Sequence, residues 1–323
     1  MAKVLETLRL KRRKDAPDPH AARRAEAFLA RLKGGGWETR ERLYYLLRDS
    51  LSDDHDSIVY AIRVYRRFFL EYRRLSGVSE PPGSVLELGP GRNLAIGLLA
   101  LASGTDAYAG ADLNPKLHGR PYWFYCRLVE ELKANPSLLV GDAATMASAA
   151  DRAGSLVREA EPGGEAEVGG GRLDYHCPCD AGALPFPDAA FDYVFSNAVF
   201  EHFHNPAAAL REIARVLRPG AVGLHKIDFR YHRDKSRPLT HLAFPAGEHE
   251  ELRTRHGWTN RWRRPDYVRA AREAGLEVIE AEITGSAEVT PTLRASLQPE
   301  FAALPEEELS ALGILLSLRR PRG

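Results

Sequence analysis

From residue 85 onwards the sequence alternates between short apolar runs rich in β-favouring residues and longer stretches with helical spacing. Such alternation requires crossover connections between strands, so it favours a mostly parallel sheet with helices on both faces. We therefore expect an α/β, doubly wound fold whose ligands bind beyond the carboxyl ends of the strands. Seven strands are expected, over residues 85–88, 107–112, 173–177, 191–196, 222–229, 276–281 and 313–318.

The break "SEPPG" separates this alternating region from the residues before it. Helical spacing before the break predicts a helical N-terminal extension over residues 1–80. Residues 81–323 then form the main domain. Two stretches within it have the character of insertions, at about residues 135–171 and 230–262. The first is expected to be helical through "AATMASAADRAGSLVREA".

The charge balance limits the kinds of partner. The chain has 45 Lys and Arg against 44 Asp and Glu, so it lacks the basic excess expected of a nucleic-acid-binding protein. It has no apolar run of about 18 residues, and no membrane partner is expected. Three cysteines are an odd count, which favours a reducing compartment over a disulfide framework. We expect a cytoplasmic protein with a small ligand, and a homodimer is compatible with the sequence.

The stretch "VLELGPGRN" places an acid and two glycines between a strand and a helix. A phosphate-binding P-loop would end in Gly-Lys-Ser/Thr, which this stretch lacks. A dinucleotide fingerprint would need a third glycine where Leu94 stands, and it would bring Glu87 close to a pyrophosphate. S-adenosylmethionine fits better, because its ammonium group suits Glu87 while Gly89 and Gly91 let the backbone approach the ligand.

A second acid, Asp112, closes the next expected strand in "YAGADLNP". It follows the glycine loop by about one βα unit, where a carboxylate can accept hydrogen bonds from both ribose hydroxyls. An aspartate before "NP" is also typical of a turn, which is the alternative interpretation.

The later stretch "CDAGALPFPDAAFDYVFSNAVFEHFHNPAAALREIARVLRPG" resembles the class I S-adenosylmethionine-dependent methyltransferases. It matches the subgroup whose pattern runs from Asp-Ala through Leu-Pro-Phe, Phe-Asp-x-Val and Glu-His to Arg-Val-Leu-x-Pro-Gly, most densely from Asp180 to Gly220. With "LELGPG" and "GADLNP" the resemblance covers roughly residues 84–230. It implies a Rossmann-like seven-stranded sheet, methyltransferase activity and S-adenosylmethionine as the cofactor.

The resemblance also implies the residues that bind the cofactor. They are Glu87, Gly89, Pro90 and Gly91 for methionine and ribose, Asp112 with Leu113 for ribose, Asp180 and Ala181 for adenine, and Asn197 near the sulfonium. The interval between Asp112 and Asp180 is longer than is usual in the family, and "SLLVGDAAT" offers Asp142 as a competing adenine residue. We prefer Asp180, because it closely precedes the Leu-Pro-Phe turn and the "FDYVFS" strand.

Methyl transfer from a sulfonium is an in-line displacement, so a base that removes a hydroxyl proton belongs at the carboxyl ends of the fourth and fifth strands. Candidate catalytic residues there are His202 in "EHFHN", and His225 and Asp228 in "LHKIDFRYHRD". A His225–Asp228 pair needs the strand to end at Ile227, because alternation otherwise sends the two side chains to opposite faces. A cation held by His225, Asp228 and His232 matches no closed metal site, so no metal is expected.

The resemblance and these residues predict O-methylation of a small-molecule acceptor, a secondary metabolite or a sugar-like hydroxyl, with a histidine as general base. The insertion at residues 230–262 would lie over the acceptor as a lid. Two alternatives stay open. One is methylation of a macromolecule, RNA or protein, through the basic N-terminus, although nucleic acid is not the expected partner. The other is a rearrangement or cyclisation beside bound S-adenosylmethionine, without methyl transfer.

Overall fold

The computed structural model describes residues 58–114, 122–159, 166–256 and 259–322. The chain divides into two compact units, Met1–Tyr60 and Ala61–Gly323. The elements below belong to the second unit, into which helix α4 (Ile58–Ser76) runs. Most of the predicted extension over residues 1–80 lies outside the described residues, and its boundary stays a prediction. In the described ranges no helix combines the length and apolar character needed to cross a bilayer.

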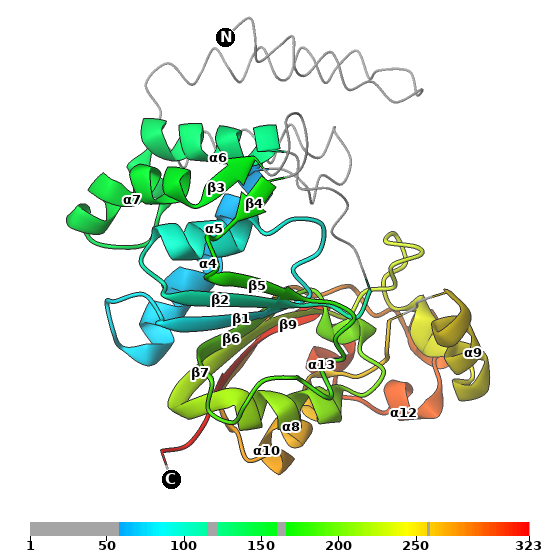
Figure 1. Ribbon diagram of the computed structural model, residues 1–323. Helices are drawn as coiled ribbons and strands as arrows, with labels where there is room; N and C mark the ends of the chain where they lie inside the picture. Colours follow the sequence, from blue (N-terminus) through cyan, green and yellow to red (C-terminus); the bar gives the residue numbers. More distant parts are fainter. Residues whose placement is uncertain (1–57, 115–121, 160–165, 257–258, 323) are drawn as a thin grey trace, which may run out of the picture. The chain divides into compact units, whose positions relative to one another are not determined.

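A seven-stranded sheet runs through the second unit (Figure 1). Its strands are β1 (Ser84–Leu88), β2 (Ala107–Ala111), β5 (Leu173–His176), β6 (Phe191–Asn197), β7 (Leu217–Asp228), β8 (Glu277–Ile283) and β9 (Gly313–Arg319). Their order is β5-β2-β1-β6-β7-β9-β8, and neighbours are parallel except β9, which is antiparallel to β7 and β8. Chain order reverses between β1 and β6, which makes their ends the topological switch point. The predicted α/β, Rossmann-like, mostly parallel seven-stranded fold is confirmed.

Helices cover both faces of this sheet (Figure 1). They include α4, α5 (Ala95–Ala102), α8 (Pro206–Val216) and α10 (Arg264–Glu273). Helices α6 (Tyr122–Ala134) and α7 (Ala143–Ser155) pack against each other, and α7 packs against α5. The apolar face of α4 packs on β6: the ring centroids of Phe68 and Phe195 are 5.0 Å apart, and those of Phe69 and Tyr193 are 5.9 Å apart. The Tyr193 hydroxyl donates a hydrogen bond of 2.9 Å to the Phe68 carbonyl. Helices α8 and α10 pack on the opposite face in an aliphatic core that includes Val194.

The first insertion contains a strand pair that the sequence pattern did not predict. The stretch predicted to be helical forms α7 only as far as Ser155, and the helical prediction is wrong beyond that point. There β3 (Val157–Glu159) pairs antiparallel with β4 (Ala166–Val168). Arg158 stands opposite Glu167 in this pair, and such cross-strand pairs of opposite charge stabilise a hairpin. The partner strand lies outside the helical stretch, so local spacing could not reveal the pairing.

Two segments that are far apart in the sequence share a second, smaller core, which we call the small core. Its elements are η3 (Thr240–Ala243), α11 (Pro291–Ser296), α12 (Pro299–Ala302) and α13 (Glu306–Ser310), and α9 (Ala246–His256) follows η3 in the chain. Its core is formed by Leu239, Leu242, Leu297, Phe301 and Leu309. Gln298 joins the two segments, because its backbone nitrogen donates to the Leu242 carbonyl at 3.1 Å and its side-chain amide donates to the Ala243 carbonyl at 2.8 Å. Figure 1 shows α9 and α12 on the same side of the sheet.

Candidate functional site

The glycine loop follows β1 at the switch point. Gly89 has a φ of 69° and Gly91 a φ of 77°, conformations that favour glycine. A Cβ atom on Gly89 would lie 2.6 Å from the Val199 side chain, so the loop passes very close to the chain beyond β6. A Cβ atom on Gly91 would meet no described atom within 4 Å. The loop therefore presents open backbone to a ligand at Gly91, while Pro90 packs over Gly110 of β2.

Glu87 is buried near the end of β1. Its carboxylate accepts a hydrogen bond from the hydroxyl of Tyr108 on β2. Burial raises the pKa of Glu87 to about 8, the hydrogen bond from Tyr108 opposes this rise, and the charge of Asp112 adds to it. The carboxyl group is therefore mostly neutral at pH 7. A cationic ligand group beside it would favour the carboxylate.

Asp112 follows β2 directly and is only 7% exposed. Its Oδ1 accepts a hydrogen bond of 3.1 Å from the Asn114 backbone nitrogen. Its Oδ2 is buried and has no hydrogen-bond partner among the described residues. Since buried carboxylate oxygens are normally paired, this atom fits a hydroxyl donor from a ligand, such as a ribose hydroxyl. Leu113 beside it is 47% exposed, which is unusual for leucine.

The structure brings Asp180 close to Asp112. The Cys179 backbone nitrogen donates to the Asp112 carbonyl at 2.9 Å, which fixes the turn after β5 against the end of β2. Asp180 is exposed in this turn, its Oδ1 accepts from the Gly182 nitrogen at 2.8 Å, and Ala181 after it is buried. The carboxylate of Asp142, the competing adenine residue, instead caps a helix.

That competing residue, Asp142, is the N-cap of α7. Its Oδ1 accepts a hydrogen bond of 2.7 Å from the Thr145 nitrogen. Hydrogen bonds from Thr145 lower the pKa of Asp142. Helix α7 packs against α5 and α6. The element before Asp142 in the chain is the short helix η1 (Pro136–Leu138), so Asp142 does not follow a strand of the main sheet. Asn197, by contrast, is the last residue of β6 and lies at the carboxyl edge with the glycine loop.

His225 lies on β7 and is fully buried. Its Nδ1 is 3.0 Å from the Ser196 hydroxyl oxygen, and its ring meets the Phe200 ring edge-on at 4.8 Å. Burial lowers the pKa of His225 to about 3, so the imidazole is neutral at ordinary pH. A side chain with this environment belongs to the core beneath the carboxyl edge.

The described structure does not join His225 and Asp228, the pair considered from the sequence. Strand β7 continues through Asp228, so alternation places the two side chains on opposite faces. Asp228 instead bonds to Arg230, whose Nε donates to its Oδ1 at 2.8 Å. Burial alone would raise the pKa of Asp228, but hydrogen bonds from His232 and Arg230 outweigh it and hold that pKa well below the usual range.

A second polar group lies beyond the ends of β6 and β7. The short helix η2 (Phe200–His202) places Glu201 in the interior, where burial, with a smaller contribution from Asp228, raises its pKa to about 8. His202 is exposed, and its ring centroid is 5.2 Å from that of His232. Glu201 is absent from the predicted site. In the sequence, Glu201 is an acid just after the carboxyl end of an expected strand. The burial of its side chain, however, is set by residues that are far away in the sequence.

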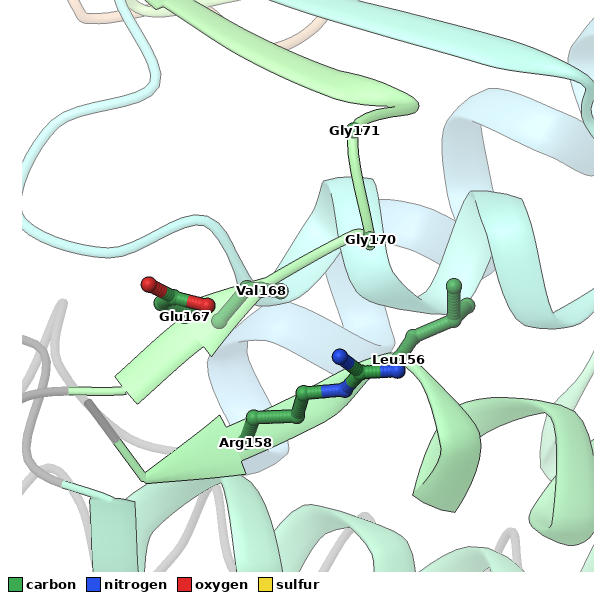
Figure 2. Close-up of a pocket in the computed structure, with 6 residues that line it drawn as sticks. All are labelled: Leu156, Arg158, Glu167, Val168, Gly170 and Gly171. Atoms are coloured by element: carbon green, nitrogen blue, oxygen red, sulfur yellow. The ribbon is translucent and has the colours of Figure 1, made fainter.

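A pocket of about 410 Å³ lies on the β3–β4 hairpin and is lined by Leu156, Arg158, Glu167, Val168, Gly170 and Gly171 (Figure 2). Gly170 and Gly171 precede β5, so the pocket is at the amino end of that strand. Since β5, β2 and β1 are parallel, it lies at the sheet edge opposite to the glycine loop. Its lining offers one opposite-charge pair and no group arranged for methyl transfer, so the carboxyl edge is the candidate site.

Comparison with known proteins identifies a family that covers most of the chain. Residues 60–281 match the sequence model of a family described as "Methyltransferase domain". The uncharacterized protein YafE of Escherichia coli (strain K12) is 52% identical over 40 residues, which cover 12% of this chain and 19% of that protein. The match thus spans about a fifth of the length of this curated relative.

Solved structures with a similar fold have low sequence identity to the chain. A S-adenosylmethionine-dependent methyltransferase from Mesorhizobium loti is 15% identical with a TM-score of 0.42, over 78% of this chain and 96% of that one. A Haloferax volcanii protein solved in complex with the Trm112 methyltransferase activator is 19% identical with a TM-score of 0.40, over 84% and 97%. Because the family match covers most of its length, the chain belongs to the methyltransferase domain family, which implies S-adenosylmethionine as its cofactor.

Proposed function

We propose that the chain methylates a hydroxyl oxygen of a small-molecule acceptor, such as a secondary metabolite or a sugar-like compound. The observation that supports cofactor binding most directly is the buried Oδ2 of Asp112, which has no hydrogen-bond partner in the described ranges and lies beside a glycine loop whose Gly91 backbone is open. When bound, S-adenosylmethionine supplies a methyl group whose bonding electron pair stays on sulfur, while an acceptor oxygen pair forms the new bond. The residues of the chain position both molecules and manage one proton.

Nine residues at the carboxyl edge would hold the cofactor. They are Glu87, Gly89, Pro90, Gly91, Asp112, Leu113, Asp180, Ala181 and Asn197. In this proposal Glu87 faces the ammonium group and Asp112 accepts from the ribose hydroxyls. We assign adenine to Asp180, because the bond from Cys179 holds its turn against Asp112 while Asp142 caps a helix.

The acceptor would lie beyond β6 and β7, where His202, His232 and Asp228 gather. His202 is the general base in this proposal, since its ring is exposed there and imidazole is the side chain that most often acts as a general base. The hydroxyl proton passes to a ring nitrogen of His202 as the oxygen is methylated. His225 would not touch the acceptor. It would act as a positioning residue through its contact with Ser196, near the end of β6.

Calorimetric titration with S-adenosylmethionine and S-adenosylhomocysteine tests the cofactor half of the proposal. We expect both to bind, after which hydroxyl-bearing compounds are screened for S-adenosylhomocysteine formation. If neither compound binds, the cofactor assignment is wrong. Binding followed by transfer to nitrogen or carbon acceptors alone would leave the cofactor site in place and overturn O-methylation.

Cofactor binding is expected to release close to one proton from Glu87 at pH 6.5. The carboxyl group is protonated there because its pKa is about 8 before the ligand binds. The ligand ammonium, already charged at this pH, favours the carboxylate. Binding should therefore tighten as pH rises toward 8, where Glu87 ionises without the ligand. The test is the dependence of binding enthalpy on buffer ionisation enthalpy, with Glu87→Gln as the control that should abolish it. A buffer-independent enthalpy for the unmodified chain would place the ammonium elsewhere.

Asp112→Ala is expected to weaken S-adenosylmethionine binding by about 1.5–3 kcal/mol, because it removes hydrogen bonds to a charged group. Calorimetry measures this change directly. Asp180→Ala and Asp142→Ala, titrated in parallel, separate the two adenine candidates, and we expect weaker binding only for Asp180→Ala. Unchanged affinity in Asp112→Ala would exclude this residue from the cofactor site.

A further inference from the structure

Three side chains with metal-ligating atoms face one another beyond the ends of β6 and β7. The carboxylates of Glu201 and Asp228 and the imidazole of His232 each bring one ligand atom, and these atoms all lie within 4.8 Å of one another. Glu201 is only 1% exposed, and neither of its carboxylate oxygens has a hydrogen-bond partner among the described residues. A buried carboxylate aimed at two other ligand groups points to a bound partner of positive charge.

The charges near this cluster favour a cation over an anion. Arg230 donates from Nε to Asp228 Oδ1 at 2.8 Å, so one positive charge already lies beside the two carboxylates. The Glu201 and Asp228 carboxylates and the His232 imidazole all offer lone pairs, which suit a cation and not an anion. In the described residues neither oxygen of the Glu201 carboxylate is hydrogen-bonded to Arg230, so Glu201 remains available to another cation.

We propose that Glu201, Asp228 and His232 form a binding site for one divalent cation of the Mn²⁺ or Mg²⁺ type, which holds the acceptor through two of its oxygens. Carboxylates suit Mg²⁺ and Mn²⁺, and a single imidazole is compatible with Mn²⁺. Three protein ligands leave about three of the six octahedral positions for the acceptor and water. Cation binding itself does not depend on the proposed methyltransfer reaction; only the placing of the acceptor rests on the proposed function.

The three groups can close on a cation by small side-chain movements. Ligands at about 2.1 Å from an octahedral ion lie about 3 Å apart, so the present separations must shrink by less than about 2 Å. The His232 Nε2 and Asp228 Oδ2 are already 3.6 Å apart. His232 follows β7 in a loop and is 35% exposed, so its ring can rotate without disturbing the core. Arg230 donates to both oxygens of that carboxylate, from Nε to Oδ1 at 2.8 Å and from Nη2 to Oδ2 at 2.5 Å. It can keep the bond to Oδ1 and orient the carboxylate while Oδ2 turns to the cation.

The cation narrows the chemical class of the acceptor. It selects a molecule with two neighbouring oxygen donors, one of which is the hydroxyl to be methylated. Contact with a divalent ion lowers the pKa of a hydroxyl group, so His202 removes the proton more readily. The O–H bond breaks, its electron pair stays on oxygen, and the proton goes to His202. That oxygen pair then forms the bond to the methyl carbon, and the C–S pair returns to sulfur.

Titration of the full chain with MnCl₂, in the absence of an acceptor, tests the site. Electron paramagnetic resonance of free Mn²⁺ gives the bound fraction, and the melting temperature gives a second readout because a cation bound to the folded state stabilises it. We expect one site per chain. Glu201→Gln, which keeps the size of the side chain, should weaken binding by at least about ten-fold, as should Asp228→Asn. Glu288→Gln is the matched control, since Glu288 is exposed on the surface and should leave binding unchanged.

Each outcome supports or overturns the cation site. Failure of the unmodified chain to bind Mn²⁺, or equal binding by the chain and Glu201→Gln, would overturn it. If Glu201→Gln does not fold, Asp228→Asn and His232→Asn decide the question. S-adenosylmethionine binding is measured on the same samples. Cofactor binding without Mn²⁺ binding removes only the cation site, whereas Mn²⁺ binding without cofactor binding removes only the proposed function.

Discussion

Replacing His202 by glutamine is expected to lower turnover about 100- to 10,000-fold, the usual contribution of a general base, while S-adenosylmethionine affinity stays the same. The reason is position: the His202 ring is exposed beyond β6, 5.2 Å from the His232 ring, and is not among the residues proposed to hold the cofactor. The measurement is the rate of S-adenosylhomocysteine formation at saturating cofactor, with the acceptor found in the screen. Raising the pH should partly restore the rate, because the hydroxyl then ionises without a base.

His204→Gln is the matched control for this variant. His204 is also exposed, two residues further along, and its Nδ1 lies 2.7 Å from Arg253 of α9. We expect its turnover to stay within a few-fold of the unmodified chain. Full turnover in His202→Gln combined with loss of turnover in His225→Gln would instead assign the base to His225.

Phe68→Ala is expected to lower the free energy of unfolding by about 3–5 kcal/mol, the range for removing a large aromatic side chain from a core. Phe68 is fully buried between α4 and the sheet, and its ring centroid lies 5.0 Å from that of Phe195. The cavity would also loosen the Phe68 carbonyl that accepts from the Tyr193 hydroxyl. Urea denaturation followed by circular dichroism measures the change.

Leu70→Ala on the same helix is the control for Phe68→Ala. Leu70 is 47% exposed, so its truncation should change the free energy of unfolding by no more than about 0.5 kcal/mol. Similar losses of unfolding free energy for the two variants would mean that α4 is not part of the domain core, in line with a domain boundary near residue 80. A large loss for Phe68→Ala alone would make α4 part of the methyltransferase domain.

The fold could be predicted because its strands have local signatures. The apolar run before the glycine loop and the "FDYVFS" stretch form buried parallel strands, as their composition indicates. The small-core helices α11, α12 and α13 carry no such signature. They have 6, 4 and 5 residues, too few for a helical period, and they are held by contacts with Leu239 and Leu242, far away in the sequence.

The sequence predicts those site residues that are positioned by the end of a strand. It does not predict those whose role depends on the burial of their side chains. Glu87 and Asp112 lie at the carboxyl ends of β1 and β2, as the pattern indicates, and their roles in binding stay predictions. The His225–Asp228 pair fails because β7 continues through Asp228. Glu201 lies in the same "EHFHN" stretch as His202, but only the packed structure shows that its carboxylate is buried with no hydrogen-bond partner among the described residues.

The position of β9 has a consequence for how the chain folds during synthesis. The strand is last in sequence order, yet it lies inside the sheet between β7 and β8. Strands β5, β2, β1 and β6 can pair as soon as residue 197 has left the ribosome, whereas the edges of β7 and β8 stay unpaired until residue 319 follows. Unpaired edges attract other chains, so the carboxyl-terminal half of the nascent sheet is the part most exposed to aggregation.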